Sequence, residues 1–288
     1  MKRIIFCLSL LICVALGAWS QIFYKIEGKG LERPSYLFGT HHYAPVSMLD
    51  SLPEVMKGLH ASECVVGEID MTGNPMDMMK AMQSHMMAPA DSTLSKLVSP
   101  EKFAQMDSVF TSLTGLSLRM FDGMKPTTSQ MTLAAMVMSK ELPETGQLDT
   151  YFQTQAKADS IATTGLETAE FQAEVLFDLI PIQRQMEALI QMLDNPEEII
   201  TQTKALNEAY LRRDGEALWQ ISYEAAKDSE GEFFEILLNR RNEAWLKQLP
   251  EMLSERPLFI AVGALHLLGD GGLVKGLTDL GYTLTPVY

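Results

Sequence analysis

Two short apolar runs, far apart in the chain, share one pattern. The later run reads Pro257-Leu-Phe-Ile-Ala-Val-Gly-Ala-Leu-His266, and the earlier one reads Ser35-Tyr-Leu-Phe-Gly-Thr-His-His42. A short, continuously apolar run is typical of a strand that is buried on both faces of a sheet. In each run the apolar residues end at a glycine, and a histidine follows three residues later. The pattern therefore predicts two buried strands that each lead into a Gly-x-x-His motif.

Further strands are expected near both ends of the chain. Residues 23–38 read as a hairpin, because two apolar runs flank the turn Gly28-Lys-Gly30. Cys64-Val-Val-Gly-Glu-Ile-Asp70 is another short apolar run, residues 160–165 are strand-like, and a final strand is expected at 282–287. The rest of the chain reads as helical, with predicted helices at 45–63, 100–113, 125–139, 148–159, 168–249 (broken near 195–196 and 214–215) and 271–280.

This distribution predicts an α/β fold in one domain that covers residues 21–288. A mixed sheet would be built from both ends of the chain, and a large helical insertion at about 74–249, interrupted by a strand near 161–165, would lie between them. Pairing of the two chain ends in one sheet would bring the two Gly-x-x-His motifs side by side.

A methionine-rich stretch follows the third expected strand, with seven methionines between Met71 and Met87 and with His85 among them. Thioether side chains are suitable ligands for Cu(I). Methionine at helical spacing is more typical of an adaptable apolar face, which could accommodate varied peptides.

The first 20 residues are typical of a secretory signal peptide. Lys2 and Arg3 precede an apolar run that is too short to span a bilayer comfortably, and Ala18-Trp-Ser20 offers a small-x-small cleavage site. We therefore expect a secreted or periplasmic protein without stable membrane insertion after cleavage. Loss of Lys2 and Arg3 changes the net charge from -14 to -16. This charge argues against nucleic acid as a partner.

Several common types of catalytic site lack support. Cys64 is the only cysteine left after signal cleavage, and it lies in an expected buried strand with no evident base. No Gly-x-Ser-x-Gly elbow occurs. Gly269-Asp-Gly-Gly272 has neither the spacing nor the lysine of a phosphate-binding loop, and it reads as a turn before a helix.

The two Gly-x-x-His motifs predict a shared metal site. Ligands of open α/β sheets sit beyond the carboxyl ends of the strands, and imidazole is the commonest protein metal ligand. Catalytic metal sites often combine two histidines with a carboxylate. His42 and His266 would be joined by Glu68, which ends a short buried strand, or by Glu167; an acid in the position of Glu167 is also typical of a helix start. Spacing favours His42, although the adjacent His41 could replace it.

Arg241 and Asn242 lie on an expected helix. A guanidinium suits a carboxylate or an oxyanion. On the helical pattern alone, we interpret both residues as solvent-exposed.

Together these motifs resemble those of the TraB/PrgY/GumN family, which includes TIKI-type metalloproteases. The resemblance covers nearly all of the mature chain and rests on an ordered set of segments: Tyr36-Leu-Phe-Gly-Thr-His-His42, Val65-Val-Gly-Glu-Ile-Asp70, Lys125-Pro126, Gly165-Leu-Glu-Thr168, Arg241-Asn242 with Trp245, and Ala261-Val-Gly-Ala-Leu-His-Leu267. The first motif of the family often reads Gly-Thr-Ile-His, and His41 takes the place of the isoleucine here.

The resemblance implies an EreA/ChaN-like α/β fold with a divalent metal ion, for which Mn, Co, Zn and Fe are the candidates. His42, His266 and Glu68 would bind the metal, with Glu68 as ligand or base, and Glu167, Arg241 and Asn242 would line the site. The expected function is an exported metal-dependent hydrolase that cleaves peptides or proteins. The alternative is a non-catalytic protein that captures a peptide or a haem-like ligand in the same pocket. A structural protein with core histidines is a third interpretation.

Overall fold

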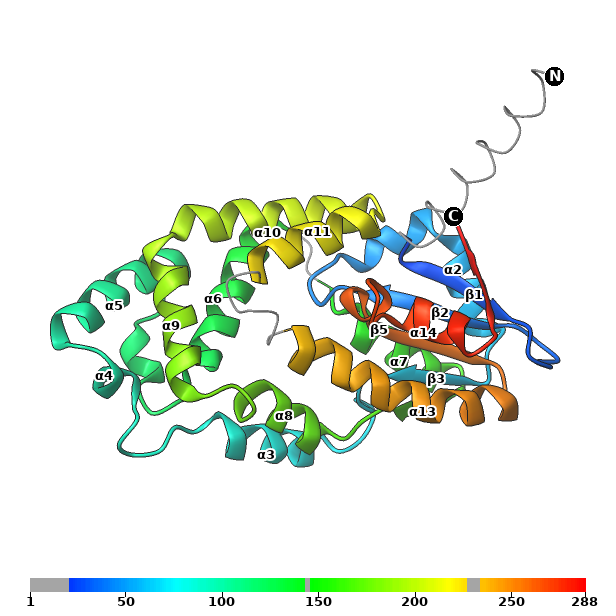
Figure 1. The fold of residues 1–288 in the computed structure, drawn as a ribbon, viewed down its shortest axis with the longest axis horizontal. Helices are drawn as coiled ribbons and strands as arrows, with labels where there is room; N and C mark the ends of the chain where they lie inside the picture. Colours follow the sequence, from blue (N-terminus) through cyan, green and yellow to red (C-terminus); the bar gives the residue numbers. More distant parts are fainter. Residues whose placement is uncertain (1–20, 143–145, 227–233) are drawn as a thin grey trace, which may run out of the picture.

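The computed structural model describes residues 21–142, 146–226 and 234–288, and within these ranges the centre of the fold is one six-stranded sheet. Its strands are β1 (Phe23–Glu27), β2 (Ser35–Thr40), β3 (Cys64–Gly67), β4 (Ala162–Gly165), β5 (Leu258–Gly263) and β6 (Thr283–Pro286), in the order β4-β3-β5-β2-β1-β6. The expected mixed sheet from both chain ends is confirmed (Figure 1).

The strands that carry the two Gly-x-x-His motifs are neighbours. β2 and β5 pair in parallel, with Gly39 opposite Val262 and Thr40 opposite Gly263. β3 pairs in parallel with both β4 and β5, whereas β1 is antiparallel to β2 and to β6. The carboxyl ends of β2, β3, β4 and β5 therefore meet at one edge of the sheet.

Gly39 is required by a close approach between β2 and the turn after β5. A Cβ atom at this position would lie 2.8 Å from the Cα of Ala264 and 3.2 Å from the side chain of Leu267. Any side chain here would push the two motifs apart. The glycine of the first motif thus allows β2 to pack closely against the turn after β5.

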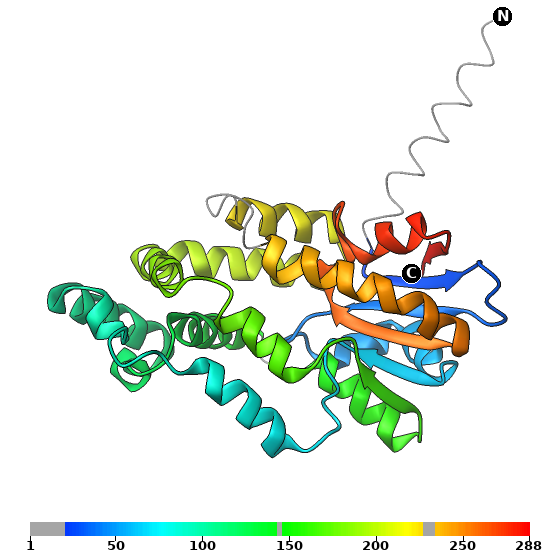
Figure 2. The same cartoon turned by 60° about the horizontal axis from the view of Figure 1, so that its bottom comes forward.

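Helices cover both faces of the sheet (Figures 1 and 2). The helices α2 (Pro53–His60) and α7 (Leu148–Ala158) lie on one face, and α13 (Arg240–Glu255) and α14 (Leu273–Asp279) lie on the other. On the first face Phe152 of α7 packs against Phe38 and Phe259, with ring centroids 5.3 and 5.0 Å apart. This layer of rings fixes α7 against the strands that lead to the site.

A second hydrophobic core lies in a helical lobe at the left of Figure 1. Its helices are α4 (Leu94–Leu97), α5 (Pro100–Thr114), α6 (Pro126–Glu141) and α9 (Ile182–Asp194), with the 3-10 helix η2 (Leu118–Phe121). Its buried residues are Leu94, Phe103, Met106, Phe110, Leu118, Leu133, Val137, Met186, Leu189 and Leu193. The expected run of helices between the sheet segments is present, although α7 and α13 within it pack on the sheet.

Four more helices connect the lobe with the sheet. They are α3 (Pro75–Met86), α8 (Ala169–Phe177), α10 (Pro196–Leu211) and α11 (Gly215–Ala226). The methionine-rich α3 has no buried residue, and it exposes Met76 and Met79. Its His85 joins α3 to α8, because Nε2 lies 3.0 Å from Glu170 and Nδ1 contacts Asp178.

The described part of the chain contains no helix that is long and apolar enough to cross a membrane. The segment for which a signal peptide is expected lies outside the described residues.

Asn207 on α10 is expected to lower the free energy of unfolding. It is 4% exposed, and neither its amide nitrogen nor its carbonyl oxygen has a hydrogen-bond partner in the described part of the chain. A buried polar group without a partner costs about 1–3 kcal/mol. Asn207→Leu should therefore raise the free energy of unfolding by about 1 kcal/mol, measured by urea denaturation.

The matched control is Gln185→Leu. Gln185 is equally buried, but its amide donates to the carbonyls of Phe177 and Ile180 at 2.9 and 2.8 Å. This variant should lose stability, and a loss in both variants would contradict the prediction for Asn207.

Candidate functional site

Glu68 follows β3 directly and reaches the end of β5. Its Oε1 accepts a hydrogen bond from the backbone N–H of Gly263 at 2.9 Å, and its Oε2 accepts from Arg241 Nη2 at 2.6 Å and from Gln172 Nε2 at 2.9 Å. Burial raises the pKa of Glu68, but His266, Arg241 and the Gly263 N–H together lower it to about 2. The carboxylate is therefore ionised at neutral pH.

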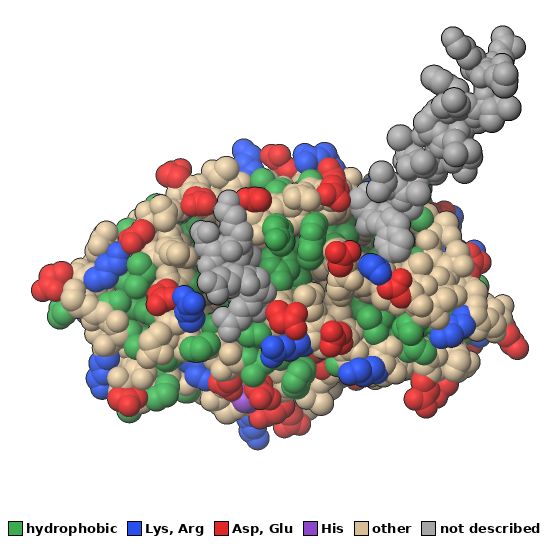
Figure 3. Space-filling model, in the orientation of Figure 1, with side chains coloured by type: hydrophobic (Ala, Val, Ile, Leu, Met, Phe, Trp, Pro, Cys, Tyr) green, Lys and Arg blue, Asp and Glu red, His purple; other side chains and the backbone are tan. Residues whose placement is uncertain are grey.

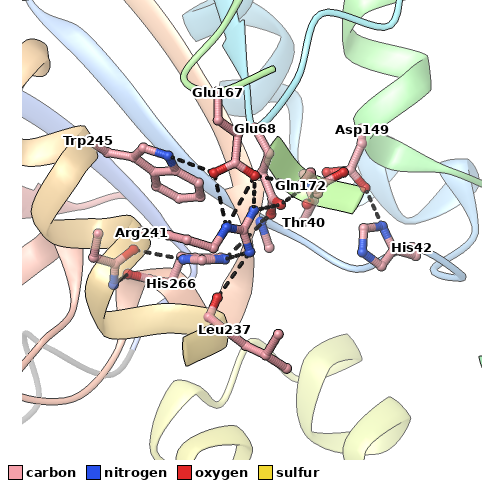
Figure 4. A network of polar contacts seen from close by, with 12 residues as sticks. Thr40, His42, Glu68, Asp149, Glu167, Gln172, Leu237, Arg241, Trp245 and His266 are labelled. Carbon is pink, nitrogen blue, oxygen red and sulfur yellow. Dashed lines mark hydrogen bonds and ion pairs between the residues drawn. The ribbon is translucent and has the colours of Figure 1, made fainter. Parts of the chain in front are cut away.

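Glu167 lies between β4 and α8 and faces the same guanidinium (Figure 4). Its Oε1 accepts from Arg241 Nη2 at 2.6 Å, and its Oε2 accepts from Trp245 Nε1 at 3.2 Å. Its side chain is 5% exposed, and this burial raises the pKa although Arg241 opposes the shift. Glu167 thus has a higher proton affinity than Glu68.

Arg241, in the first turn of α13, lies at the centre of the cluster. It is 5% exposed, so the interpretation of Arg241 as a solvent-exposed helix residue is wrong; the same holds for Asn242, which is 1% exposed. Nη1 donates to the carbonyl of Leu237 at 3.0 Å and lies 3.0 Å from His266 Nε2. Nε and Nη2 donate to the two glutamates, so every nitrogen of the guanidinium has an acceptor.

His266 is held in one orientation and one tautomer. Its Nδ1 lies 2.7 Å from Asn242 Oδ1, while Asn242 Nδ2 donates to the carbonyls of His266 and Gly271 at 3.1 and 2.8 Å. Since Asn242 Oδ1 is an acceptor, Nδ1 of His266 carries the proton and Nε2 presents its lone pair. Burial lowers the pKa of His266 to about 3, so the ring is neutral. Its Nε2 lies 3.7 Å from Glu68 Oε1.

His42 has a comparable anchor, but it lies to one side of the cluster (Figure 4). Its Nδ1 is 2.9 Å from Asp149 Oδ2, and Asp149 Oδ1 accepts from the hydroxyl of Thr40. The hydrogen bond to Asp149 raises the pKa of His42 to about 9. The ring is 64% exposed, whereas the Asp149 side chain beneath it is 8% exposed.

The contacts of His41 indicate a packing role and not that of a metal ligand. Its ring packs against Tyr210 with centroids 5.0 Å apart, and its Nδ1 accepts from the backbone N–H of Tyr43 at 3.3 Å. Burial lowers the pKa of His41 to about 4. In the described residues no carboxylate contacts His41, whereas His42 has Asp149.

The predicted metal site has suitable donor groups, but they are not arranged around one point. Among the described residues no group of three or more His, Cys, Asp or Glu side chains is arranged to hold one. Both histidines have Nδ1 tied to an oxygen, which makes Nε2 the donor atom for a ligand. Nε2 of His266 already accepts from Arg241 Nη1 at 3.0 Å, so a metal ion would have to displace this hydrogen bond. Metal-ligating histidines nearly always have such an anchor on the second ring nitrogen. His266 and the ionised Glu68 already lie together, and His42 lies nearby.

The structure therefore brings together Glu68, Glu167, Arg241, Asn242 and His266, whose catalytic or ligand roles stay predictions. It also adds Asp149 and Gln172, which the sequence did not indicate. Asp149 lies in the first turn of α7, where an acid is common because it stabilises the helix dipole. Gln172 lies in α8, and no motif distinguishes it from a surface glutamine.

Arg241 is expected to be essential for stability. Its removal leaves two buried carboxylates without their cation, and breaking a buried ion pair costs about 3–5 kcal/mol. Arg241→Met should lower the free energy of unfolding by this amount in urea denaturation, and adding Glu167→Gln should restore part of it.

Arg240→Met is the matched control. Arg240 is exposed and lies 3.4 Å from Glu235, so its loss should change stability by less than about 0.5 kcal/mol. Equal effects at the two positions would contradict the central role of Arg241.

Comparison with known proteins gives one match, which is to a protein family. The model of the TraB/PrgY/gumN family matches residues 22–286. No curated protein and no solved structure matches the chain.

Proposed function

Because the chain belongs to the TraB/PrgY/gumN family, we propose that it is an exported metal-dependent hydrolase of peptide bonds. The observation that supports this proposal most is the shared anchoring of His42 and His266. Each ring is fixed through Nδ1, by Asp149 or by Asn242, at the same edge of the sheet. Nε2 of His266 accepts from Arg241 Nη1 at 3.0 Å, a hydrogen bond that a bound metal ion would replace. Such anchoring is the usual setting of a metal-ligating imidazole.

His42, His266 and Glu68 would hold a divalent metal ion. His266 is neutral and Glu68 is ionised, which are the protonation states that metal binding requires. His42, with a pKa of about 9, is protonated at neutral pH and would release a proton when it binds the metal. When bound, such an ion polarises a carbonyl group and lowers the pKa of water from 15.7 to about 7.

Glu167 is the candidate for proton transfer. Its raised pKa brings it closer to neutral pH than Glu68, and an effective general acid or base has a pKa near the working pH. Trp245 Nε1 and Arg241 hold its two oxygens in place. Glu167 would accept a proton from the attacking water and donate it to the leaving amine.

Arg241 acts mainly as a positioning residue. Its nitrogens donate to Glu68, Glu167 and the Leu237 carbonyl, so holding an oxyanion would require one of these bonds to break. Gln172 supports the same arrangement, since its Nε2 lies 2.9 Å from Glu68 and 3.2 Å from Glu167. Asn242 orients His266.

Metal content provides the first test. Protein purified without a chelator should contain about one equivalent of Mn, Co, Zn or Fe by elemental analysis. His266→Ala should lose the metal, and His41→Ala should retain it, because His41 packs on Tyr210. No metal in the wild-type protein after reconstitution would contradict the proposal. It would favour the alternative of a protein that captures its ligand without cleaving it.

The carboxylate behind His42 provides the second test. Asp149→Asn removes the anionic acceptor of His42 Nδ1, and loss of such a partner typically costs 10–100-fold in metal affinity or activity. A competition titration with a chelating dye should show this loss. Cleavage of a peptide library should fall in parallel.

Asp159→Asn is the control for Asp149. Asp159 contacts an exposed histidine, His60, at 3.1 Å, and neither residue belongs to the cluster. This variant should bind metal as the wild type does, and a loss equal to that of Asp149→Asn would show that the effect is not local.

Export is tested by the N-terminus of the mature protein. If the signal peptide is removed after Ser20, protein recovered from the periplasm or the medium should begin at Gln21, as measured by mass spectrometry. Recovery of the protein only inside the cell, with Met1 to Ser20 attached, would contradict export.

A further inference from the structure

A pocket of about 650 Å³ lies next to the Arg241 cluster. One wall is α11, with Glu216, Trp219 and Tyr223, and the opposite wall is the loop of residues 267–271. This loop begins directly after His266, and Asn239, two residues before Arg241, also lines the pocket. Figure 3 shows apolar surface at the position of α11 with acidic side chains around it.

Two glycines of Gly269-Asp-Gly-Gly272, Gly269 and Gly271, are explained by this pocket. Gly269 has φ +73°, and a Cβ atom there would lie 2.5 Å from the indole of Trp219. A Cβ atom at Gly271 would lie 2.4 Å from Asn239 Oδ1. Only glycine lets the indole and the amide lie directly against the loop backbone. The motif therefore builds a pocket wall.

The aromatic rings of Trp219 and Tyr223, together with Leu267 and Leu268, form the apolar part of the pocket lining. Trp219 and Tyr223 stack with centroids 6.4 Å apart and an angle of 27°, and Phe234 packs edge-on against Trp219 at 5.3 Å. Tyr223 is 53% exposed, so part of this cluster is open to solvent. The faces of tryptophan and tyrosine attract cations.

The charges in the pocket also favour a cation. Glu216 and Asp270 are exposed carboxylates of the lining. The one cation in the described lining, Lys275, lies 2.5 Å from Asp279, which offsets its charge. Glu216 keeps one carboxylate oxygen beyond the one that accepts from Gln220 at 2.9 Å. The whole chain has a net charge of -14, which adds to the attraction.

Asn242 connects this pocket with the candidate site. One amide group orients His266 through Nδ1 and holds the carbonyl of Gly271 in the pocket wall. A side chain bound in the pocket would therefore lie against the loop whose first residue follows His266.

We propose that this pocket binds a positively charged side chain, arginine or lysine, of the peptide substrate. The inference deepens the proposed hydrolase function by naming the substrate class. Trp219 and Tyr223 contact the cation through their ring faces, and Glu216 and Asp270 neutralise its charge.

Binding is measured by calorimetry on the full chain with EDTA present, so that no metal-dependent cleavage is needed. The probes are hexapeptides, acetylated and amidated at their ends, with alanine at all positions but one. That position is arginine, norleucine or glutamate. The wild type should bind the arginine peptide about tenfold more tightly than the norleucine peptide, within the range of a cation–π contact with partial desolvation. The glutamate peptide should bind more weakly still.

Two variants locate the effect. Tyr223→Ala and Glu216→Lys should each weaken the arginine peptide about three- to tenfold while changing the norleucine peptide by less than about twofold. Both positions are exposed, so the fold should tolerate the changes. Glu251→Lys is the matched control, because it changes the net charge equally at an exposed position of α13 outside the pocket lining. It should change neither affinity by more than about twofold.

Equal affinity for the arginine and norleucine peptides in the wild type would overturn the inference. So would equal weakening by Glu216→Lys and Glu251→Lys, because attraction by the overall charge would then suffice. Binding of N-acetylarginine amide as tight as that of the peptide would overturn a peptide substrate. If the protein prefers arginine but binds no metal and cleaves no peptide, the hydrolase proposal fails while the pocket assignment stands. If it cleaves peptides without preferring arginine, the hydrolase proposal stands while the pocket assignment fails.

Discussion

The buried guanidinium of Arg241 is the interaction on which the candidate site depends. Glu68 comes from the end of β3, Glu167 from the end of β4, and His266 from the turn after β5, and all three contact this one group. Burying two carboxylates is costly unless a cation with suitable geometry accompanies them. A guanidinium provides that geometry, since its planar fork can donate to both carboxylates and to a carbonyl at once. A lysine here would offer one compact charge and could not hold the three strand ends together.

The sheet topology explains why these residues meet. Parallel neighbours place their carboxyl ends on one edge, and the register of β2 against β5 sets the two Gly-x-x-His motifs beside each other. The helical lobe forms a separate core, so its packing does not need to match the geometry of the strands. Helices α7 and α13 belong to the same run of helices along the chain, but they pack on the sheet and not in the lobe. They cover opposite faces of the sheet and bring Asp149 and Arg241 to the same edge.

Much of this arrangement could be predicted from the sequence, because buried strands and their glycines have strong local patterns. The positions of His42, Glu68 and His266 follow from the ends of such strands. The charge of Arg241 predicts an exposed position, whereas the spacing of its neighbours predicts a buried one. Arg241, Trp245, Leu249 and Leu253 recur every four residues, which places the arginine on the buried face of α13. Asp149 had no such signal, since its contact with His42 joins residues 107 positions apart and depends on how α7 packs.

Asn242 shows how strictly the geometry limits one position. Its oxygen accepts from His266 Nδ1, and its nitrogen donates to the carbonyls of His266 and Gly271. An aspartate could accept but would place a carboxylate against two carbonyl oxygens, and a leucine would leave all three partners buried without a bond. A glutamine could form the same types of bond, but its extra methylene would displace the amide from partners 2.7 to 3.1 Å away. One amide thus fixes both the lone pair that His266 presents and the loop that lines the neighbouring pocket. The loop and the imidazole therefore depend on the same side chain for their positions.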